Sequence, residues 1–593
     1  MTMLCVPLTG STCEQMLRDM QAATAAGAGM VELRLDYLQD HSEPAIRKLM
    51  AAADKFPGEV IATCRLASEG GQWDGDESRR VSLLEQAGLA GADYIDFEYA
   101  AWQASANVRQ KIGLVCEVDA HTERPRPKLI LSKHNFERTP TNLDTLFAEL
   151  AAEPAHVVKL VCKANRITDA VRILEALRNA RKHPPHPPRY KGGQRGVYKG
   201  GRWQTETDEI ASETSTPPLG KGGQGGVIAL SMGEAGILAR VLAGKFDALL
   251  TFASLEAGKE SAPGQLTLAQ MRSLYRWDSL RADTLVYGVI GCPVAHSMSP
   301  AIMNAAFGAT GHNGVYLPLL VEPAYEDFAA FVSGCIERPW LDLRGCSVTI
   351  PHKQNLLRFV EQHGGEIESL TRRIGAANTL VIQPCGTGVS PVESHLRDAG
   401  ATREEDTGVT PVPHKLYAYN TDYRGAMNAL LAGLEGTGKD LHDAAVAVLG
   451  AGGASRAIVA GLRDTGASVT IYNRTAERAN QLADEFGCQA KPWEQRGQLE
   501  ADVVVNCTSI GMWPNVDDSP LPETTLRAST AVFDTVYNPI ETRLLRESRL
   551  RGCRVIDGVA MFVGQAAAQF RLWTNLSPPT AIMRQVVIQR LSR

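Results

Sequence analysis

Short runs of β-branched and other apolar residues alternate with longer stretches of helical periodicity along the first part of the chain. The runs are Met3–Leu8, Met30–Leu35, Glu59–Arg65, Tyr94–Glu98, Lys128–Ser132, Val157–Val161, Val227–Ser231 and Ala248–Phe252. Most are separated by roughly 15 to 30 residues with helical spacing of apolar positions. Strands alternating with helices in this way predict a (β/α)8 TIM barrel, which the pattern favours over an open doubly wound sheet with the same alternation.

Two segments of low complexity interrupt this alternation, from about His183 to Gly226 and from about Pro384 to His414. Each contains its own short repeat and is dense in proline, glycine and polar residues, which cannot bury enough apolar surface to offset chain entropy. We therefore expect both to be mobile, disordered surface insertions. A glycine-rich phosphate loop at Lys191–Gly193 or Lys221–Gly223 is the weaker alternative, because neither precedes a helical pattern.

The positions of the two insertions predict that neither disturbs an active site. The first follows the helical stretch Thr168–Lys182 and precedes the seventh strand, so it leaves the barrel at the end opposite the one where barrel enzymes bind substrate. The second lies between the strand-like runs Thr379–Gln383 and Lys415–Tyr419, as the tip of a hairpin does.

The length of 593 residues predicts two or three domains, and a polar link at Asp278–Thr284 places a boundary ahead of a new strand, Leu285–Ile290. A hydrophobic content of 44% and a charged content of 21% are those of a soluble globular protein. The net charge of −5 argues against a nucleic-acid partner. The twelve cysteines form no CxxC pair, which favours reduced thiols in the cytoplasm over disulfides or a zinc site. Neither a secretory signal at Met1–Gly10 nor a membrane-spanning run is visible.

Charged side chains fall at the ends of the predicted barrel strands, which is unusual for structural residues. They are Glu32, Arg34, Arg65 and Glu98, with His134 following the fifth strand. Lys159 lies inside the apolar run Val157–Val161, where burial would favour a neutral amine able to form a Schiff base with a ketone. From the spacing alone, a lysine that snorkels from a strand end to solvent is an equally weighted alternative.

Six segments resemble the motif series of type I 3-dehydroquinate dehydratases, in the family's order. They are Glu32-Leu-Arg-Leu-Asp, Thr63-Cys-Arg-Leu-Ala-Ser-Glu-Gly-Gly71, Ile95-Asp-Phe-Glu98, Ser132-Lys-His-Asn-Phe136, Val158-Lys-Leu160 and Ser261-Ala-Pro-Gly-Gln265. The resemblance implies that Lys159 forms the imine, with His134 as general acid and base positioned by Glu98. It also implies that the substrate's carboxylate and hydroxyls are held by Glu32, Arg34, Arg65, Arg240, Ser261 and Gln265. No metal is implied, because the imine serves as the electron sink.

A strand, a glycine turn and a helix follow one another in the second half, in the order that a dinucleotide pyrophosphate needs. The strand Val446–Leu449 leads into Gly450, Ala451, Gly452, Gly453, Ala454 and Ser455, and an apolar helical run follows. The next strand, Ser468–Tyr472, ends in Asn473, Arg474 and Thr475, where an NAD enzyme would place an acidic residue. An arginine there favours the 2′-phosphate, and thus NADP over NAD.

Other segments of the second half closely resemble shikimate dehydrogenase. They are Ser297-Met-Ser299-Pro300, Ser347-Val-Thr-Ile-Pro-His-Lys353, Ala376-Ala-Asn378-Thr, Tyr419-Asn-Thr-Asp422, Asn506-Cys-Thr-Ser-Ile-Gly-Met512, Asp534-Thr-Val-Tyr-Asn-Pro539 and Asp557-Gly-Val-Ala-Met-Phe-Val-Gly-Gln565. The resemblance implies a catalytic pair, Lys353 and Asp422. Substrate contacts would come from Ser297, Ser299, Thr349, Asn378, Asp422, Tyr537 and Gln565, and further cofactor contacts from Thr508, Gly558 and Met561.

The domains expected from these observations are a barrel over residues 1–278, a substrate lobe over 284–425, an NADP-binding Rossmann lobe over 426–564 and a C-terminal helical segment, 565–593, that packs back on the substrate lobe. The implied function is consecutive: dehydration of 3-dehydroquinate, then reduction of 3-dehydroshikimate to shikimate. A sensor that binds these metabolites without turnover is disfavoured, because Lys159, His134, Lys353 and Asp422 are all present. Activity of the second half on quinate stays open.

Overall fold

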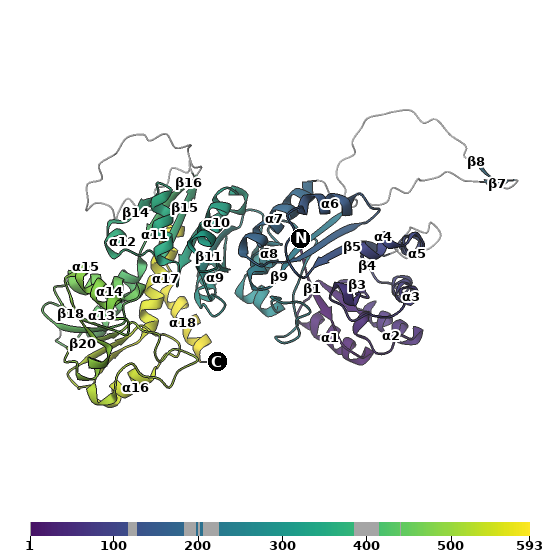
Figure 1. Cartoon of the computed structure of the whole chain (residues 1–593). Coiled ribbons are helices and arrows are strands. Elements are labelled where there is room, and N and C mark those ends of the chain that lie inside the picture. The colour runs from purple at the N-terminus through teal and green to yellow at the C-terminus, as the bar shows by residue number, and fades with distance from the viewer. Residues whose placement is uncertain are drawn as a thin grey trace. The chain divides into compact units, whose positions relative to one another are not determined.

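A computed structural model describes residues 2–116, 127–182, 197–199, 202–204, 225–384, 414–438 and 440–592 (Figure 1). The chain divides into two compact units, the first made of Met1–Asn165 and Asp169–Met271 and the second of Arg166–Thr168 and Arg272–Arg593. Most of the two expected insertions lies outside the described residues. Within the first, β7 (Val197–Lys199) and β8 (Arg202–Gln204) form an antiparallel pair.

The first unit contains a sheet of eight strands in the order β10-β1-β2-β3-β4-β5-β6-β9, in which every neighbouring pair is parallel. The strands are β1 (Met3–Leu8), β2 (Met30–Arg34), β3 (Glu59–Thr63), β4 (Tyr94–Glu98), β5 (Lys128–Asn135), β6 (Val157–Lys163), β9 (Gly226–Met232) and β10 (Leu250–Phe252). The N–H of Leu249 donates to the Val227 carbonyl, which brings the last strand beside β9. The sheet is therefore a nearly closed barrel, as the sequence predicted, because an open doubly wound sheet would not follow chain order around a ring.

Helices of the first unit follow the strands and bury one apolar face each. They are α1 (Cys13–Ala25), α2 (Glu43–Ala53), α3 (Glu77–Leu89), α4 (Tyr99–Ala104), α5 (Ala106–Cys116), α6 (Leu143–Ala151), α7 (Ile167–Lys182) and α8 (Ile237–Leu242). Thr12 and Asp76 begin α1 and α3 by accepting hydrogen bonds from backbone N–H groups of the first turn. In α2 the buried positions Ile46, Leu49 and Met50 recur at helical spacing, so packing on the barrel stabilises this helix.

The second unit begins with a mixed sheet in the order β12-β11-β13-β15-β16-β14. The strands are β11 (Leu285–Gly291), β12 (Gly314–Leu320), β13 (Leu343–Val348), β14 (Glu366–Ile367), β15 (Thr379–Pro384) and β16 (His414–Tyr419), and the helices are α9 (Ser299–Thr310), α10 (Tyr325–Ile336), α11 (Lys353–Gln362) and α12 (Ser369–Ile374). β15 and β16 pair antiparallel from Thr379–Tyr419 to Pro384–His414, so the strands beside the second insertion form the predicted hairpin.

Residues just before this sheet are also held in the second unit. Tyr275 and Trp277 are buried, and the guanidinium of Arg276 donates to the carbonyls of His312 at 3.1 Å and Gly314 at 2.8 Å. The short segment ahead of β11 therefore belongs to the second unit and is anchored there by Arg276.

A second sheet of the same unit is parallel throughout, in the order β19-β18-β17-β20-β21-β22. The strands are β17 (Ala445–Leu449), β18 (Ser468–Asn473), β19 (Gln489–Pro492), β20 (Val503–Asn506), β21 (Ala531–Asp534) and β22 (Arg554–Ile556), and the helices are α14 (Gly453–Asp464), α15 (Ala476–Phe486) and α16 (Arg543–Leu550). Strand order reverses at β17, and a crevice at the carboxyl ends of the strands around such a reversal binds dinucleotides. The predicted Rossmann fold is confirmed.

Three further helices complete the second unit: α13 (Thr421–Leu434), α17 (Gly558–Thr574) and α18 (Thr580–Leu591). Phe570 of α17 and Met583 of α18 share a buried cluster with Tyr287 of β11 and Phe307 of α9. The C-terminal helices thus cover the mixed sheet. Among the described residues, no helix has the length and apolar character needed to cross a membrane.

Candidate active sites

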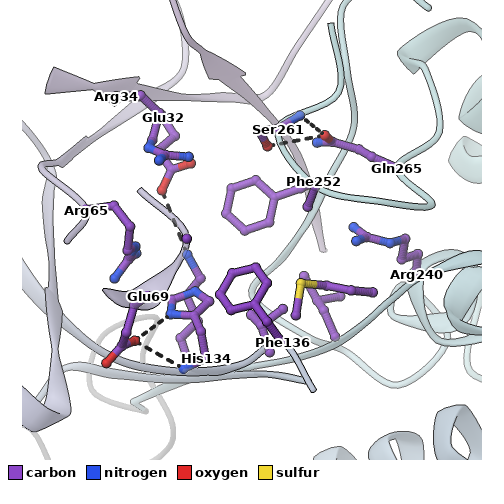
Figure 2. Close-up of a pocket in the computed structure, with 16 residues that line it drawn as sticks. Glu32, Arg34, Arg65, Glu69, His134, Phe136, Arg240, Phe252, Ser261 and Gln265 are labelled. Carbon is purple, nitrogen blue, oxygen red and sulfur yellow. Dashed lines mark hydrogen bonds and ion pairs between the residues drawn. The ribbon is translucent and has the colours of Figure 1, made fainter. Parts of the chain in front are cut away.

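One pocket of about 540 Å³, open to solvent, lies at the carboxyl ends of the barrel strands (Figure 2). Its lining includes the predicted residues Glu32, Arg34, Arg65, His134, Lys159, Arg240, Ser261 and Gln265, together with Glu69, Phe136 and Phe252, which sequence reasoning did not single out. His134 lies within β5 instead of following it. The barrel therefore brings together side chains from most of its strands.

Lys159 lies in this pocket with its side chain buried. Its ammonium is 2.7 Å from Asp96 Oδ2 and 3.8 Å from Glu32 Oε1, and it lies 4.6 Å from the centre of the Phe252 ring. The two carboxylates give this buried amine anionic partners that the apolar sequence around it did not indicate. The alternative that Lys159 extends from the strand end to solvent is excluded, because its side chain is only 4% exposed.

Asp96 and Glu98, two residues apart on β4, are the anions of a buried network under the pocket. Asp96 accepts hydrogen bonds from Ser132 Oγ at 2.6 Å and forms an ion pair with Arg65 at 2.7 Å. Burial alone would raise the pKa of Asp96, but Arg65 and Lys159 hold it well below its usual value. Asp96 is thus an ionised carboxylate that faces the amine of Lys159.

The structure corrects the expected partner of His134, which is Glu69 and not Glu98. Glu69 Oε2 lies 3.0 Å from His134 Nδ1 and also accepts from the His134 backbone N–H at 3.2 Å (Figure 2). The oxygens of Glu98 are taken by Arg65 at 3.1 Å, by Arg80 at 2.5 Å and by the N–H of Leu66. Glu98 is completely buried between these cations, so the prediction that it positions His134 is wrong.

Glu69 lies in the loop after β3, within the segment Thr63–Gly71 that carried part of the family resemblance. Burial raises the pKa of Glu69 to about 7, although Arg65 opposes the shift. Burial and the cation of Arg65 lower the pKa of His134 well below its usual value. A neutral imidazole beside a carboxyl group that titrates near neutral pH is suited to proton transfer.

Arg240 and Gln265 offer unused hydrogen-bond donors to the same pocket. Among the described residues, neither Arg240 Nε nor Gln265 Nε2 has a partner, although both are buried. Gln265 is oriented by Ser261, whose N–H and hydroxyl donate to its Oε1 at 2.8 and 3.2 Å. Burial lowers the pKa of Arg240 to about 10. A buried cation without an anion partner is costly, so this end of the pocket is suited to a carboxylate ligand.

A second site in the other unit centres on Lys353 and Asp422, whose Nζ and Oδ2 atoms are 2.5 Å apart. Lys353 is the first residue of α11, and Asp422 lies in the first turn of α13. Asn420 fixes that turn by accepting from the backbone N–H of Asp422 and Tyr423. The predicted pair therefore forms where two helices begin.

The other residues predicted to contact the substrate form smaller groups. Ser297 Oγ accepts from the Ser299 N–H at 3.3 Å, and Asn378 Oδ1 accepts from the N–H of Thr421, next to Asp422, at 2.8 Å. Tyr537 stacks on Phe562 of α17 at 4.1 Å, and Gln565 Nε2 donates to the Phe562 carbonyl. Thr349 lies between β13 and α11, and its N–H donates to Ile290 of β11. No hydrogen bond among the described residues joins these groups directly to the Lys353–Asp422 pair.

The glycine turn lies against this pair. A side-chain carbon added at Gly453 would lie 3.1 Å from Lys353 Cδ, so the start of α14 approaches the lysine closely. Gly450 has a φ of 109°, which only glycine adopts readily. Ser455 is buried and accepts from the Gly452 N–H at 3.2 Å. The turn is thus shaped for close backbone approach, with the free N–H groups of α14 at its edge.

The other predicted cofactor residues lie near the carboxyl ends of the parallel strands. Asn473 Nδ2 donates to the Thr475 carbonyl, and the exposed Arg474 lies between them after β18. Thr508 donates to Asn506 Oδ1 at 2.7 Å after β20, and α17 begins at Gly558, with Met561 buried in its first turn. Ala451 and Ala454 complete the turn. Within the described ranges, no group of three or more metal-ligating side chains occurs.

Comparison with known families agrees with this division. A model for type I 3-dehydroquinase matches residues 4–190 and 222–281 and leaves out 191–221, which belong to the first insertion. Models for the shikimate dehydrogenase substrate-binding domain, shikimate/quinate 5-dehydrogenase and the shikimate 5′-dehydrogenase C-terminal domain match residues 289–380, 434–513 and 558–588.

Known relatives cover either the second half or the whole chain. Shikimate dehydrogenases (NADP(+)) from Moorella thermoacetica and Bacillus subtilis are 37% and 36% identical over 52% of this chain, and the matches cover 94% and 97% of those proteins. The chloroplastic bifunctional 3-dehydroquinate dehydratase/shikimate dehydrogenase of Arabidopsis thaliana is 33% identical over 99% of this chain and 84% of its own length. The chain therefore belongs to the family of bifunctional 3-dehydroquinate dehydratase/shikimate dehydrogenases.

Proposed function

We propose that the two units catalyse consecutive reactions: the barrel dehydrates 3-dehydroquinate to 3-dehydroshikimate, and the second unit reduces this product to shikimate with NADPH. The observation that carries the proposal is that each unit places one lysine beside a carboxylate in a site suited to its reaction. Lys159 shares a pocket with a histidine and with Arg240, whose Nε has no hydrogen-bond partner among the described residues. Lys353 lies next to the glycine turn of a dinucleotide fold.

Four functional segments follow from this proposal. The predicted bounds are 1–278 for the dehydratase, 284–425 for the substrate lobe, 426–564 for the NADP lobe and 565–593 for the C-terminal segment that supports the substrate lobe. Residues 272–278, however, belong to the compact unit of the dehydrogenase. The cytoplasmic location expected from the cysteine pattern stays a prediction, since the Arabidopsis relative is named as chloroplastic.

In the dehydratase, Lys159 first gives a proton to water and, as the neutral amine, attacks the ketone carbon. Loss of water from this adduct gives an imine, whose positive nitrogen accepts electrons when the adjacent carbon loses a proton. His134 removes that proton, and the ring expels its β-hydroxyl as water with a proton returned by the imidazole. Hydrolysis of the imine frees Lys159, so the whole cycle removes one water from the substrate.

The substrate is oriented in this scheme by charges at opposite sides of the pocket. Arg240 takes the carboxylate in its planar fork, aided by Gln265 Nε2 and Ser261. Glu32, Arg34 and Arg65 contact the ring hydroxyls. Arg34 keeps a fixed direction because Asp36 accepts from its Nε at 3.0 Å and its NH2 group at 2.7 Å.

Replacement of Glu69 by glutamine tests how His134 is positioned. We expect the dehydratase kcat to fall by roughly 100-fold, because the imidazole loses the carboxylate that stabilises its charged form. In the unsubstituted chain, the carboxylate of Glu69 is present above its pKa of about 7 and is lost as the pH falls below it. The kcat should therefore decline on the acid side of pH 7, and Glu69→Gln should remove this pH dependence.

The matched control is Glu98→Gln on β4. This change leaves the buried cations Arg65 and Arg80 with less compensation, so we expect a loss of about 3–5 kcal/mol in the free energy of unfolding. The Glu98→Gln protein that still folds should keep the pH dependence of the dehydratase kcat. If Glu98→Gln removes the acid limb and Glu69→Gln does not, the assignment of Glu69 is wrong.

NADP fits the glycine turn and its surroundings. The start of α14 supplies N–H groups and a positive dipole end for a pyrophosphate, and Arg474 supplies a cation after β18, where no acidic residue would repel a 2′-phosphate. When bound, NADPH would supply the hydride. Lys353 protonates the ketone oxygen as the hydride arrives, and Asp422 holds the ammonium in place. The substrate ring is bound by Ser297, Ser299, Thr349, Asn378, Tyr537 and Gln565.

Replacement of Arg474 by alanine tests the choice of cofactor. We expect the KM for NADPH to rise by about tenfold or more, because a charge-assisted contact to the 2′-phosphate is lost, while the KM for NADH changes little. Steady-state kinetics with both cofactors measure the ratio. The control is Arg527→Ala, an exposed arginine that precedes β21 toward the opposite edge of the parallel sheet, which should leave both values unchanged. Equal increases in the KM for NADPH and in the KM for NADH would contradict the assignment of Arg474 to the 2′-phosphate.

The proposal as a whole is tested with the complete chain and 3-dehydroquinate. An enone absorbance should appear without cofactor, and addition of NADPH should then oxidise the cofactor and consume the enone. Absence of the enone contradicts the dehydratase assignment. Absence of NADPH oxidation when 3-dehydroshikimate is supplied directly contradicts the dehydrogenase assignment.

A further inference from the structure

A buried glutamine of α17, Gln569, connects the strands beneath the second site. Only 1% of its surface is exposed, yet it makes hydrogen bonds at both ends of its amide. Its Oε1 accepts from Ser347 Oγ at 2.7 Å, and Ser347 in turn accepts from the Tyr316 hydroxyl at 2.6 Å. Buried polar groups are costly unless they are paired, and this one is fully paired.

The other end of the amide fixes its direction. Gln569 Nε2 donates to the carbonyl of Asn378 at 3.2 Å and to Thr379 Oγ1 at 3.0 Å. A carbonyl can only accept, so the nitrogen of the amide must face Asn378 and the oxygen must face Ser347. Thr379, which receives a hydrogen from Gln569, gives its own to Asn378 Oδ1 at 2.7 Å. Gln569 therefore acts on both the main chain and the side chain of Asn378.

As a consequence, the side-chain amide of Asn378 has a defined orientation with a known donor group. Its Oδ1 accepts from Thr379 and also from the N–H and hydroxyl of Thr421, at 2.8 and 3.1 Å. Among the described residues, no hydrogen bond uses its Nδ2. With the oxygen engaged by three donors, Nδ2 is the group left to meet a ligand, and Thr421 connects this arrangement to Asp422.

We propose that Gln569 is a positioning residue for the dehydrogenase reaction, which fixes Asn378 so that its Nδ2 group donates to a hydroxyl or carbonyl oxygen of the substrate. The inference rests on the proposed function, because Asn378 is assigned to the substrate there. Gln569 itself lies behind Asn378 and touches neither substrate nor cofactor.

Replacement of Gln569 by glutamate gives a test that depends on pH. The introduced group has nearly the same shape, and in its protonated form it still donates a hydrogen to the Asn378 carbonyl and accepts one from Ser347. As a carboxylate it faces that carbonyl with negative charge and draws the Thr379 hydrogen away from Asn378. The KM for 3-dehydroshikimate, relative to the unsubstituted chain, should rise about tenfold between about pH 6 and about pH 9.

Two further variants separate hydrogen bonding from packing. Gln569→Met keeps the length of the side chain without its hydrogen bonds, so its KM ratio should be raised by a similar factor at every pH. Gln589→Glu makes the same chemical change at an exposed position of α18 and should leave the ratio near one. The KM for NADPH should stay unchanged in all three, which also shows that the nucleotide lobe is folded.

The inference is overturned if the ratio for Gln569→Glu does not depend on pH, or if Gln569→Met has the KM of the unsubstituted chain. A fall in kcat without a rise in KM would also overturn it. If Gln569→Glu does not fold, Gln569→Met alone decides through the KM for 3-dehydroshikimate. These failures differ from failure of the proposed function, in which the unsubstituted chain would not reduce 3-dehydroshikimate at all.

Discussion

The Lys159→Ala chain is expected to lose dehydratase activity by at least about 10⁴-fold while retaining the NADPH-dependent reduction of 3-dehydroshikimate. The reason is that the amine is the proposed nucleophile, and no other group in the pocket can replace an imine as electron sink. The two rates are measured separately, from enone absorbance with 3-dehydroquinate and from NADPH oxidation with 3-dehydroshikimate. Borohydride added during turnover should attach the substrate carbon skeleton to Lys159, as a mass increase on the peptide that contains it.

The strand itself provides a matched control. Lys163 is an exposed lysine at the end of β6, the strand that carries Lys159, so Lys163→Ala should retain full activity and trapping. If borohydride labels the Lys159→Ala chain as strongly as the unsubstituted one, the nucleophile has been misassigned. A Lys159→Ala chain that dehydrates at the normal rate would rule out the imine mechanism altogether.

The Lys353→Ala chain is expected to show the reverse pattern. Reduction of 3-dehydroshikimate should fall by roughly 10²- to 10⁴-fold, the range for removal of a general acid, while dehydration of 3-dehydroquinate is unchanged. Because Lys353 lies 2.5 Å from Asp422, loss of either partner should disable the same step. Single-turnover oxidation of NADPH measures this step without interference from product release.

Asp422→Asn serves as the second half of this experiment. The double variant Lys353→Ala/Asp422→Asn should be little slower than the slower single variant, because residues that act as a unit have non-additive effects. Strictly additive losses would mean that the two residues act independently. Unchanged NADPH oxidation in Lys353→Ala would falsify the assignment of the general acid.

The barrel could be predicted from the sequence because its strands are short apolar runs bounded by turn residues. β1 and β4 have the predicted bounds, and the other strands differ by one to three residues at an end. Strand ends shift because apolar content does not show where a strand stops pairing. Thus β5 continues to Asn135 and includes His134, although the polar residues around this histidine are typical of a loop.

The partners of charged groups could not be predicted in the same way. Glu98 ends a strand as the substrate residues do, but Arg80 of α3, 18 residues before it, lies against it. Glu69 ends a 3-10 helix of three residues, Ala67–Glu69, which is too short for periodicity to indicate the direction of a side chain. The ion pair of Lys159 with Asp96 joins residues 63 positions apart and depends on the register between β4, β5 and β6. Such contacts form when the barrel closes, so they cannot be predicted from the residue pattern of a single segment.

The anchored segment before β11 has a practical consequence for dissecting the chain. A dehydrogenase cut at Thr284, where the polar link ends, would lack Tyr275, Arg276 and Trp277. It would leave the carbonyls of His312 and Gly314 without the Arg276 donor and would lose two rings that are buried in the whole chain. A truncation that starts at Arg272 keeps these contacts, so that is where an isolated dehydrogenase for crystallisation or inhibitor screening should begin.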